Sequence, residues 1–90
     1  MKIKKIEWNK EKNKILKNGR HVCFEDIENA INDNRVLDIL PHPNKEKYSH
    51  QKILVVKIKE YIHYVPFVED DEKYFLKSII PSRKLNDKYL

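Results

Sequence analysis

The chain opens with a short apolar alternation followed by a stretch that favours a helix. Residues 2–7 alternate weakly between Lys and Ile, which predicts a short strand closed by Trp8. Residues 10–18 are rich in Lys, Glu and Asn, and we expect a helix here with Asn9 as its N-cap and Gly19 as its C′ residue. The apolar face of this helix is thin, since it has only Ile15 and Leu16. We therefore expect the helix to lie on the surface with its lysines in water.

A second and clearer helix is predicted over residues 24–34. Its apolar residues recur at the spacing of one helix face and predict a buried stripe of Phe24, Ile27, Ala30 and Ile31. Acidic residues occupy its first turns, where they interact favourably with the helix dipole. Cys23 stands at the position of the helix cap, and we expect a small buried thiol there and no nucleophile.

After Asn34 the pattern changes to that of strands. β-branched and aromatic runs predict strands over 36–40, 53–58, 61–68 and 74–80. Between them we expect a polar loop over 41–51, a tight turn at Lys59-Glu60 and an acidic turn over 69–72. Pro66 indicates an edge or a bulge, because proline has no N–H for a strand ladder. Pro81 and Ser82 end the last strand, and residues 83–89 are a short basic helix or tail.

The order of elements predicts an α+β fold, β-α-α-β-β-β-β with a short C-terminal helix or tail. We expect the two early helices to pack on one face of an antiparallel sheet and the other face to be partly open. Ninety residues support one domain, 1–90, without repeats or linkers.

Composition excludes several classes of protein. One cysteine cannot form an internal disulfide, and the single glycine excludes glycine-rich phosphate loops. The longest apolar runs are too short to span a membrane, and no leader segment is recognisable. We expect a cytoplasmic protein without a cofactor. The four histidines lack metal-ligand spacing, so no metal site is predicted.

Charge is unevenly distributed along the chain. The net charge is +5, but residues 1–20 carry +6 and residues 73–90 carry +4, while residues 69–72 carry −4. If both basic ends lie on one face, they make a patch suited to phosphates; the alternative is an ordinary lysine-rich surface. Sixteen of the nineteen cations are lysine, so arginine is rare in this chain and the positions of its three arginines are informative. If the phosphates belong to RNA, the lysines expected to contact them through charge are Lys12, Lys17, Lys52, Lys77 and Lys84.

Two segments carry candidate chemistry. The loop between the second and third strands gathers several proton-transfer groups: His42, Glu46, Lys47, Tyr48 and His50. Arg83 directly follows the last strand and offers a planar fork for bidentate phosphate contact. Cleavage of RNA without a metal needs a base for the 2′-OH, an acid for the leaving oxygen and cations for the phosphorane, and these residues can divide the roles. The alternatives are a solvated polar loop and a tail paired with the acidic turn.

Aromatic side chains on a sheet face are a further means of contacting RNA. Tyr61, His63 and Phe67 alternate with apolar residues along one predicted strand, so one of its faces has groups that can stack on unpaired bases. Ordinary core alternation is the competing interpretation.

Several motifs resemble one known family. The opening Glu7-Trp8-Asn9, the helix ending in Leu16-Lys17-Asn18-Gly19 and the segment Val22-Cys23-Phe24-Glu25-Asp26-Ile27 resemble the start of BrnT-family toxins. Ile79-Ile80-Pro81-Ser82-Arg83 is similar to that family's closing Ile-Ile-Ser-Ala-Arg segment. The chain departs from the pattern at Asn9 and Cys23, where the family has aspartate and serine, and in the added Arg20-His21.

The resemblance covers most of the chain and implies a RelE-like fold and an RNA-cleaving toxin of a type II toxin–antitoxin pair, held inactive by a cognate antitoxin protein. By motif match it assigns Arg83 to a phosphate or the transition state. A non-catalytic RNA- or protein-binding module on the same fold is the alternative.

Overall fold

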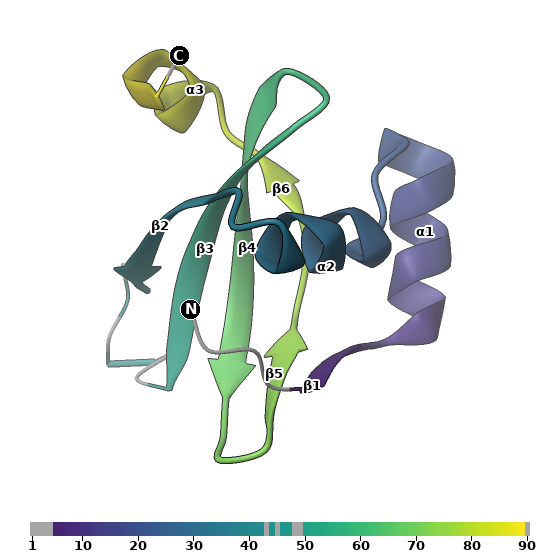
Figure 1. Ribbon diagram of the computed structural model, residues 1–90, viewed down its shortest axis with the longest axis vertical. Helices are drawn as coiled ribbons and strands as arrows, with labels where there is room; N and C mark the ends of the chain where they lie inside the picture. Colours follow the sequence, from purple (N-terminus) through teal and green to yellow (C-terminus); the bar gives the residue numbers. More distant parts are fainter. Residues whose placement is uncertain (1–4, 43, 45, 48–49, 90) are drawn as a thin grey trace.

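The computed structural model describes residues 5–42, 44, 46, 47 and 50–89, and it has three helices and a mixed open sheet (Figure 1). The elements in chain order are β1 Lys5–Trp8, α1 Lys10–Arg20, α2 Phe24–Asn32, β2 Val36–Pro41, β3 Gln51–Ile58, β4 Tyr61–Glu69, β5 Lys73–Leu76, β6 Ile80–Pro81 and α3 Arg83–Tyr89. The predicted α+β class is confirmed. None of these helices is long and apolar enough to cross a membrane.

The sheet has the strand order β1-β5-β4-β3-β2, with β6 beside the first part of β4. The strands from β2 to β5 pair antiparallel, as predicted. β1, however, pairs with β5 in parallel, so the prediction of a purely antiparallel sheet is wrong. The two helices carry the chain from β1 at one edge of the sheet to β2 at the other edge. The meander from β2 to β5 then brings β5 back beside β1 in the same direction.

The predicted apolar stripe of α2 is confirmed as the centre of the core. Phe24, Ile27, Ala30 and Ile31 are all buried, and α2 crosses one face of the sheet over Leu54 and Val56 of β3. The helix begins after Cys23, whose backbone N–H donates to Asp26 Oδ2 at 3.1 Å. The sequence predicts a small buried thiol at Cys23, but the side chain is only partly buried. Burial still raises the pKa of that thiol, which agrees with an inert side chain.

α1 lies on the surface beside α2 and reaches the core through Leu16, whereas Ile15 is 69% exposed. Asn9 is its N-cap, as predicted, and Asn9 Oδ1 accepts the N–H of Lys12 at 3.0 Å. The predicted C-terminus is wrong, because the helix continues through Gly19 and Arg20. His21 takes the left-handed conformation that ends it, with a φ of 58°.

β3 and β4 form the predicted hairpin around Lys59 and Glu60. Both turn residues have positive φ, 52° and 67°, as a type I′ turn requires, although glycine and asparagine are the residues that adopt it easily. The Lys59 ammonium group donates to the carbonyl oxygen of His21, so the turn is tied to the α1–α2 connection.

The predicted strand 74–80 is interrupted, and that prediction is wrong. β5 pairs with residues 67–69 of β4, β6 pairs with residues 63–64, and the register shifts by one residue between them. The N–H of Lys77 donates to the Pro66 carbonyl oxygen at 2.8 Å, which shows that Pro66 faces this side of the ladder. Pro66 has no N–H to return, and the ladder breaks where that donor is missing.

The sheet face opposite α2 is apolar and partly open. Strand register places Leu40, Pro66, Val68 and Phe75 on it, and all four are half-buried. At one end of the sheet α3 packs against β4, where Asn86 Oδ1 accepts the N–H of Ile62 at 3.0 Å. Ser82 caps α3 through its hydroxyl, which accepts the N–H of Leu85 at 3.2 Å.

Candidate nucleic-acid interface

Contacts place the three arginines toward the end of the sheet that carries the β3–β4 turn. Arg35 lines hollows with Lys59 of that turn, Arg20 reaches the residue before β6, and Arg83 follows Ser82, whose N–H donates to the Ile62 carbonyl oxygen. Arg20 closes α1, Arg35 precedes β2, and Arg83 opens α3. The Arg20 guanidinium donates to the Ile79 carbonyl oxygen at 2.7 Å. Arg35 borders the same hollows as Lys59. We call the group Arg20, Arg35, Lys59 and Arg83 the basic end.

His63 of β4 is the buried titratable side chain nearest to this group. It is 7% exposed, and its Nδ1 lies 3.0 Å from the carbonyl oxygen of Tyr61. A carbonyl can only accept, so Nδ1 carries the proton in the neutral ring and Nε2 has the free lone pair. Within the described part of the chain Nε2 makes no hydrogen bond, and no buried side-chain nitrogen there is without a partner. Nε2 therefore keeps some contact with solvent, although the residue as a whole is only 7% exposed.

The surroundings of His63 favour the neutral ring. Burial lowers the pKa of His63 below its usual 6.5, and the positive charge of Arg20 lowers it further. The hydrogen bond to Tyr61 and the carboxylate of Asp26 raise the same pKa and only partly offset the burial. The Tyr61 ring meets the imidazole edge-on at 5.9 Å between centroids. His63 is thus a neutral base at pH 7 beside a cation.

Two shallow hollows adjoin the basic end. One, of about 370 Å³, is lined by Arg35, Leu37, Lys57, Lys59 and Glu60. The other, of about 170 Å³, is lined by Asp26, Asn29, Arg35, Ile58 and Lys59. Arg35 and Lys59 belong to both.

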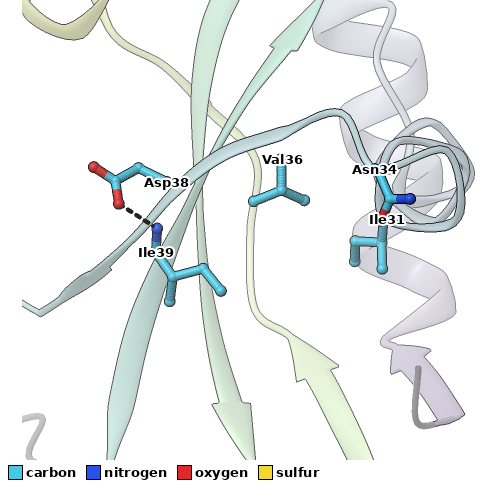
Figure 2. A pocket seen from close by; sticks show the side chains of 5 residues that line it. All are labelled: Ile31, Asn34, Val36, Asp38 and Ile39. Carbon is cyan, nitrogen blue, oxygen red and sulfur yellow. Dashed lines mark hydrogen bonds between the residues drawn. The ribbon is translucent and has the colours of Figure 1, made fainter. Parts of the chain in front are cut away.

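A third hollow, of about 360 Å³, lies beside β2 and the end of α2, and its lining has no cation (Figure 2). The Asp38 carboxylate accepts the N–H of Ile39 at 2.9 Å, so this donor of the edge strand is already occupied. Carboxylates on an edge strand discourage the addition of a further strand. We assign no chemistry to this hollow.

The loop residues predicted to be catalytic lie at the opposite end of the sheet from Arg83. Pro81 pairs with His63 and His63 with Val56, whereas the loop joins β3 at Gln51, five residues away. Five strand residues span about 17 Å, and α3 extends the chain further from the loop. The structure therefore does not bring Arg83 together with His42, Glu46, Lys47 or His50.

The loop residues that the structure describes make local contacts. His42 Nδ1 accepts the N–H of Asn44 at 3.1 Å, and Asn44 Oδ1 accepts the N–H of Lys47 at 3.2 Å. Glu46, Lys47 and His50 are exposed. Tyr48 lies outside the described residues.

The five lysines expected to bind RNA do not form one patch. Lys17 and Lys84 lie within a few residues of Arg20 and Arg83, near the basic end. Lys12 is exposed in the first half of α1. At the loop end Lys52 pairs with Glu69 at 3.7 Å, and the Lys77 ammonium group lies 5.4 Å from the centre of the Phe75 ring.

Two interpretations of β4 were open, a stacking face for bases and ordinary core alternation. Phe67 is 1% exposed and belongs to the core, so core alternation is the correct interpretation there. Tyr61 stays half-buried at the basic end. Among the described residues no three His, Cys, Asp or Glu side chains are grouped to hold a metal ion.

Comparison with family models, curated proteins and solved structures found no match for this chain. The resemblance to BrnT-family toxins therefore stays a prediction. Sequence reasoning did not single out Arg20, Arg35 or Lys59, and it named His63 only as a group that could stack on bases. The usable signal for His63 was a single imidazole within an otherwise apolar strand.

Proposed function

We propose that this protein is a metal-independent endoribonuclease, the RelE-like toxin of a type II toxin–antitoxin pair, and that it acts on RNA bound at the basic end. The observation that carries the proposal is the imidazole of His63, whose Nδ1 is held by the Tyr61 carbonyl oxygen, whose Nε2 lone pair is free, and whose pKa is lowered by burial and by the charge of Arg20. A base with a pKa at or below neutrality, next to cations, is what abstraction of a ribose proton needs.

The proposed reaction is an in-line transfer within the RNA. Nε2 of His63 takes the proton of the 2′-OH, and O2′ then forms a bond to phosphorus. The bond from phosphorus to O5′ breaks, and O5′ takes a proton from water or from an ammonium group of the basic end. The products are a 2′,3′-cyclic phosphate and a 5′-OH. Arginine side chains there stabilise the charge of the phosphorane.

The partner and the setting follow from the same proposal. We expect a cognate antitoxin with an acidic segment that folds on the basic surface and forms a hetero-oligomer in the cytoplasm. Expression of the protein alone should arrest growth, and Arg83→Ala should relieve the arrest while the fold is retained, because Arg83 is exposed.

The deciding experiment incubates the purified protein with RNA in EDTA and maps the ends. Cyclic or 3′-phosphate ends that disappear in His63→Gln and weaken in Arg83→Ala support the proposal. Lys10→Gln is the control, since Lys10 is exposed at the start of α1, far from the basic end. Full-rate cleavage by a folded His63→Gln protein would refute the role of His63.

A non-catalytic RNA- or protein-binding module is the second candidate. The low exposure of His63, 7%, favours it, because a ribose must approach Nε2 closely to lose a proton. This candidate predicts RNA that remains intact but is bound with a strong dependence on salt.

A further inference from the structure

We infer that the two hollows at the basic end are neighbouring nucleotide sites that share one phosphate contact, and that single-stranded RNA bends around this end of the sheet. The inference rests on the proposed function for its ligand, RNA, but it concerns binding and does not involve His63.

The two hollows lie on opposite faces of the sheet. Lys57 lines the larger and Ile58 the smaller, and consecutive strand residues point to opposite faces. Arg35 and Lys59 line both, so these two cations stand between the hollows at the end of the sheet. A phosphodiester placed on them would have one nucleoside on each side.

The larger hollow suits an amphipathic anion. Leu37 is 46% exposed there, one of three large apolar side chains exposed in the described chain, and it lies among three cations. Its volume, about 370 Å³, is at the lower end of the range for small-molecule sites, about 300–1,000 Å³. A ribose or base can cover Leu37 while its phosphate reaches the cations.

The smaller hollow offers hydrogen-bonding groups to a nucleobase. Asp26 and Asn29 line it, and together they offer acceptors and a donor to a base edge. A nucleotide has a phosphate for Arg35 and Lys59, which stand between the hollows, and a base edge for Asp26 and Asn29 in the smaller hollow.

Arg35 is free to exchange partners. Its ion pair with Asp33, at 3.4 Å, is exposed on both sides, and such pairs add little to stability. Arg35→Gln should therefore leave the fold intact and remove only the shared phosphate contact.

The test measures binding of a fluorescently labelled 2′-O-methyl RNA by anisotropy over a range of salt concentrations. This probe lacks the 2′-OH nucleophile, so binding is read without cleavage. Arg35→Gln should weaken binding roughly tenfold, the loss expected for one charge-assisted contact. It should also bring the slope of log K against log salt closer to zero by about 0.7, the value for one phosphate on a single strand.

Two further variants separate the inference from a simple charge effect. Lys10→Gln removes the same charge at the start of α1 and should leave affinity and slope unchanged. Leu37→Ser should weaken binding roughly threefold with no change of slope, because it removes apolar contact only. Equal losses in Arg35→Gln and Lys10→Gln, an unaffected Leu37→Ser, or Arg35-dependent binding of polyglutamate in place of RNA would each overturn the inference.

The outcome is distinguishable from that of the proposed function. Arg35-dependent binding of RNA that the protein never cuts would uphold the two sites and refute the nuclease. Cleavage of RNA by a protein whose binding ignores Arg35 would do the reverse.

Discussion

Replacing Glu60 by glycine should stabilise the protein, because Glu60 is held at a φ of 67° in the β3–β4 turn. A residue with a Cβ in the left-handed region is strained by roughly 1–2 kcal/mol, and glycine is not. The greater freedom of glycine in the unfolded chain cancels roughly 0.5–1 kcal/mol of this gain. We expect a net increase of about 0.5–1 kcal/mol in the free energy of unfolding.

Glu60→Ala is the matched control, since it also removes the carboxylate that pairs with Lys57 but keeps the Cβ. That ion pair lies 3.3 Å apart with the Glu60 side chain 89% exposed, so its loss should cost little. The difference between the glycine and alanine variants therefore measures the backbone alone.

Urea unfolding followed by the fluorescence of Trp8 provides the measurement. Trp8 is the only tryptophan and stacks on Phe24 with 5.7 Å between ring centroids, so its emission should report loss of the core. With an m-value of about 1–2 kcal/mol/M, the glycine variant should unfold at a urea concentration roughly 0.5 M higher than the alanine variant. Equal midpoints, or a lower midpoint for glycine, would refute the left-handed turn.

Three further changes test the helix caps and the buried histidine. Asn9→Ala removes the cap of α1 and should cost about 1 kcal/mol, a fall of roughly 4–8 °C in the melting temperature by circular dichroism, while the exposed Asn18→Ala should cause no loss. Asn13→Ala should cost roughly 1–3 kcal/mol in urea unfolding, because Asn13 Oδ1 accepts the part-buried N–H of Phe24 at 2.7 Å. For His63 the pKa is lower in the folded protein than the ordinary 6.5, so the unfolded state binds the proton more readily. Stability should be full above pH 6.5 and fall as the pH drops below it, and the free energy of unfolding of His63→Gln should lack this part of the pH dependence.

The helices were predictable because their signals are local. The stripe of α2 follows from spacing, and the Asn9 cap follows from one side chain and the backbone three residues on. The end of α1 was not predictable in the same way. Gly19 has the intrinsic preference for the left-handed position, but His21 takes it, and the ammonium group of Lys59 holds the His21 carbonyl from 38 residues away. A local preference gave way to a tertiary contact.

The arrangement of the candidate site depended on strand register, which the sequence specifies only indirectly. Arg83 and the loop around His42 looked like parts of one site because each follows a strand. The ladder from Val56 through His63 to Pro81 places them at opposite ends of the sheet. The same ladder brings Arg83 to the end of the sheet where Arg20 and Arg35 also lie. No local sequence pattern predicts that these three residues share one end of the sheet.

The parallel pairing of β1 with β5 joins Lys5 to Lys73 and Trp8 to Leu76, residues that are 68 positions apart in the sequence. Because a ribosome releases the N-terminal part first, β1 stays without its partner strand until residues 73–76 have been made. Closing so long a loop costs more chain entropy than closing the hairpins, so this contact should form late in folding. A chain cut short before residue 73 would lack the strand that β1 requires, and the Trp8 ring would lose its Leu76 neighbour. The edge of the sheet at β1 is therefore completed only after β5 has been synthesised.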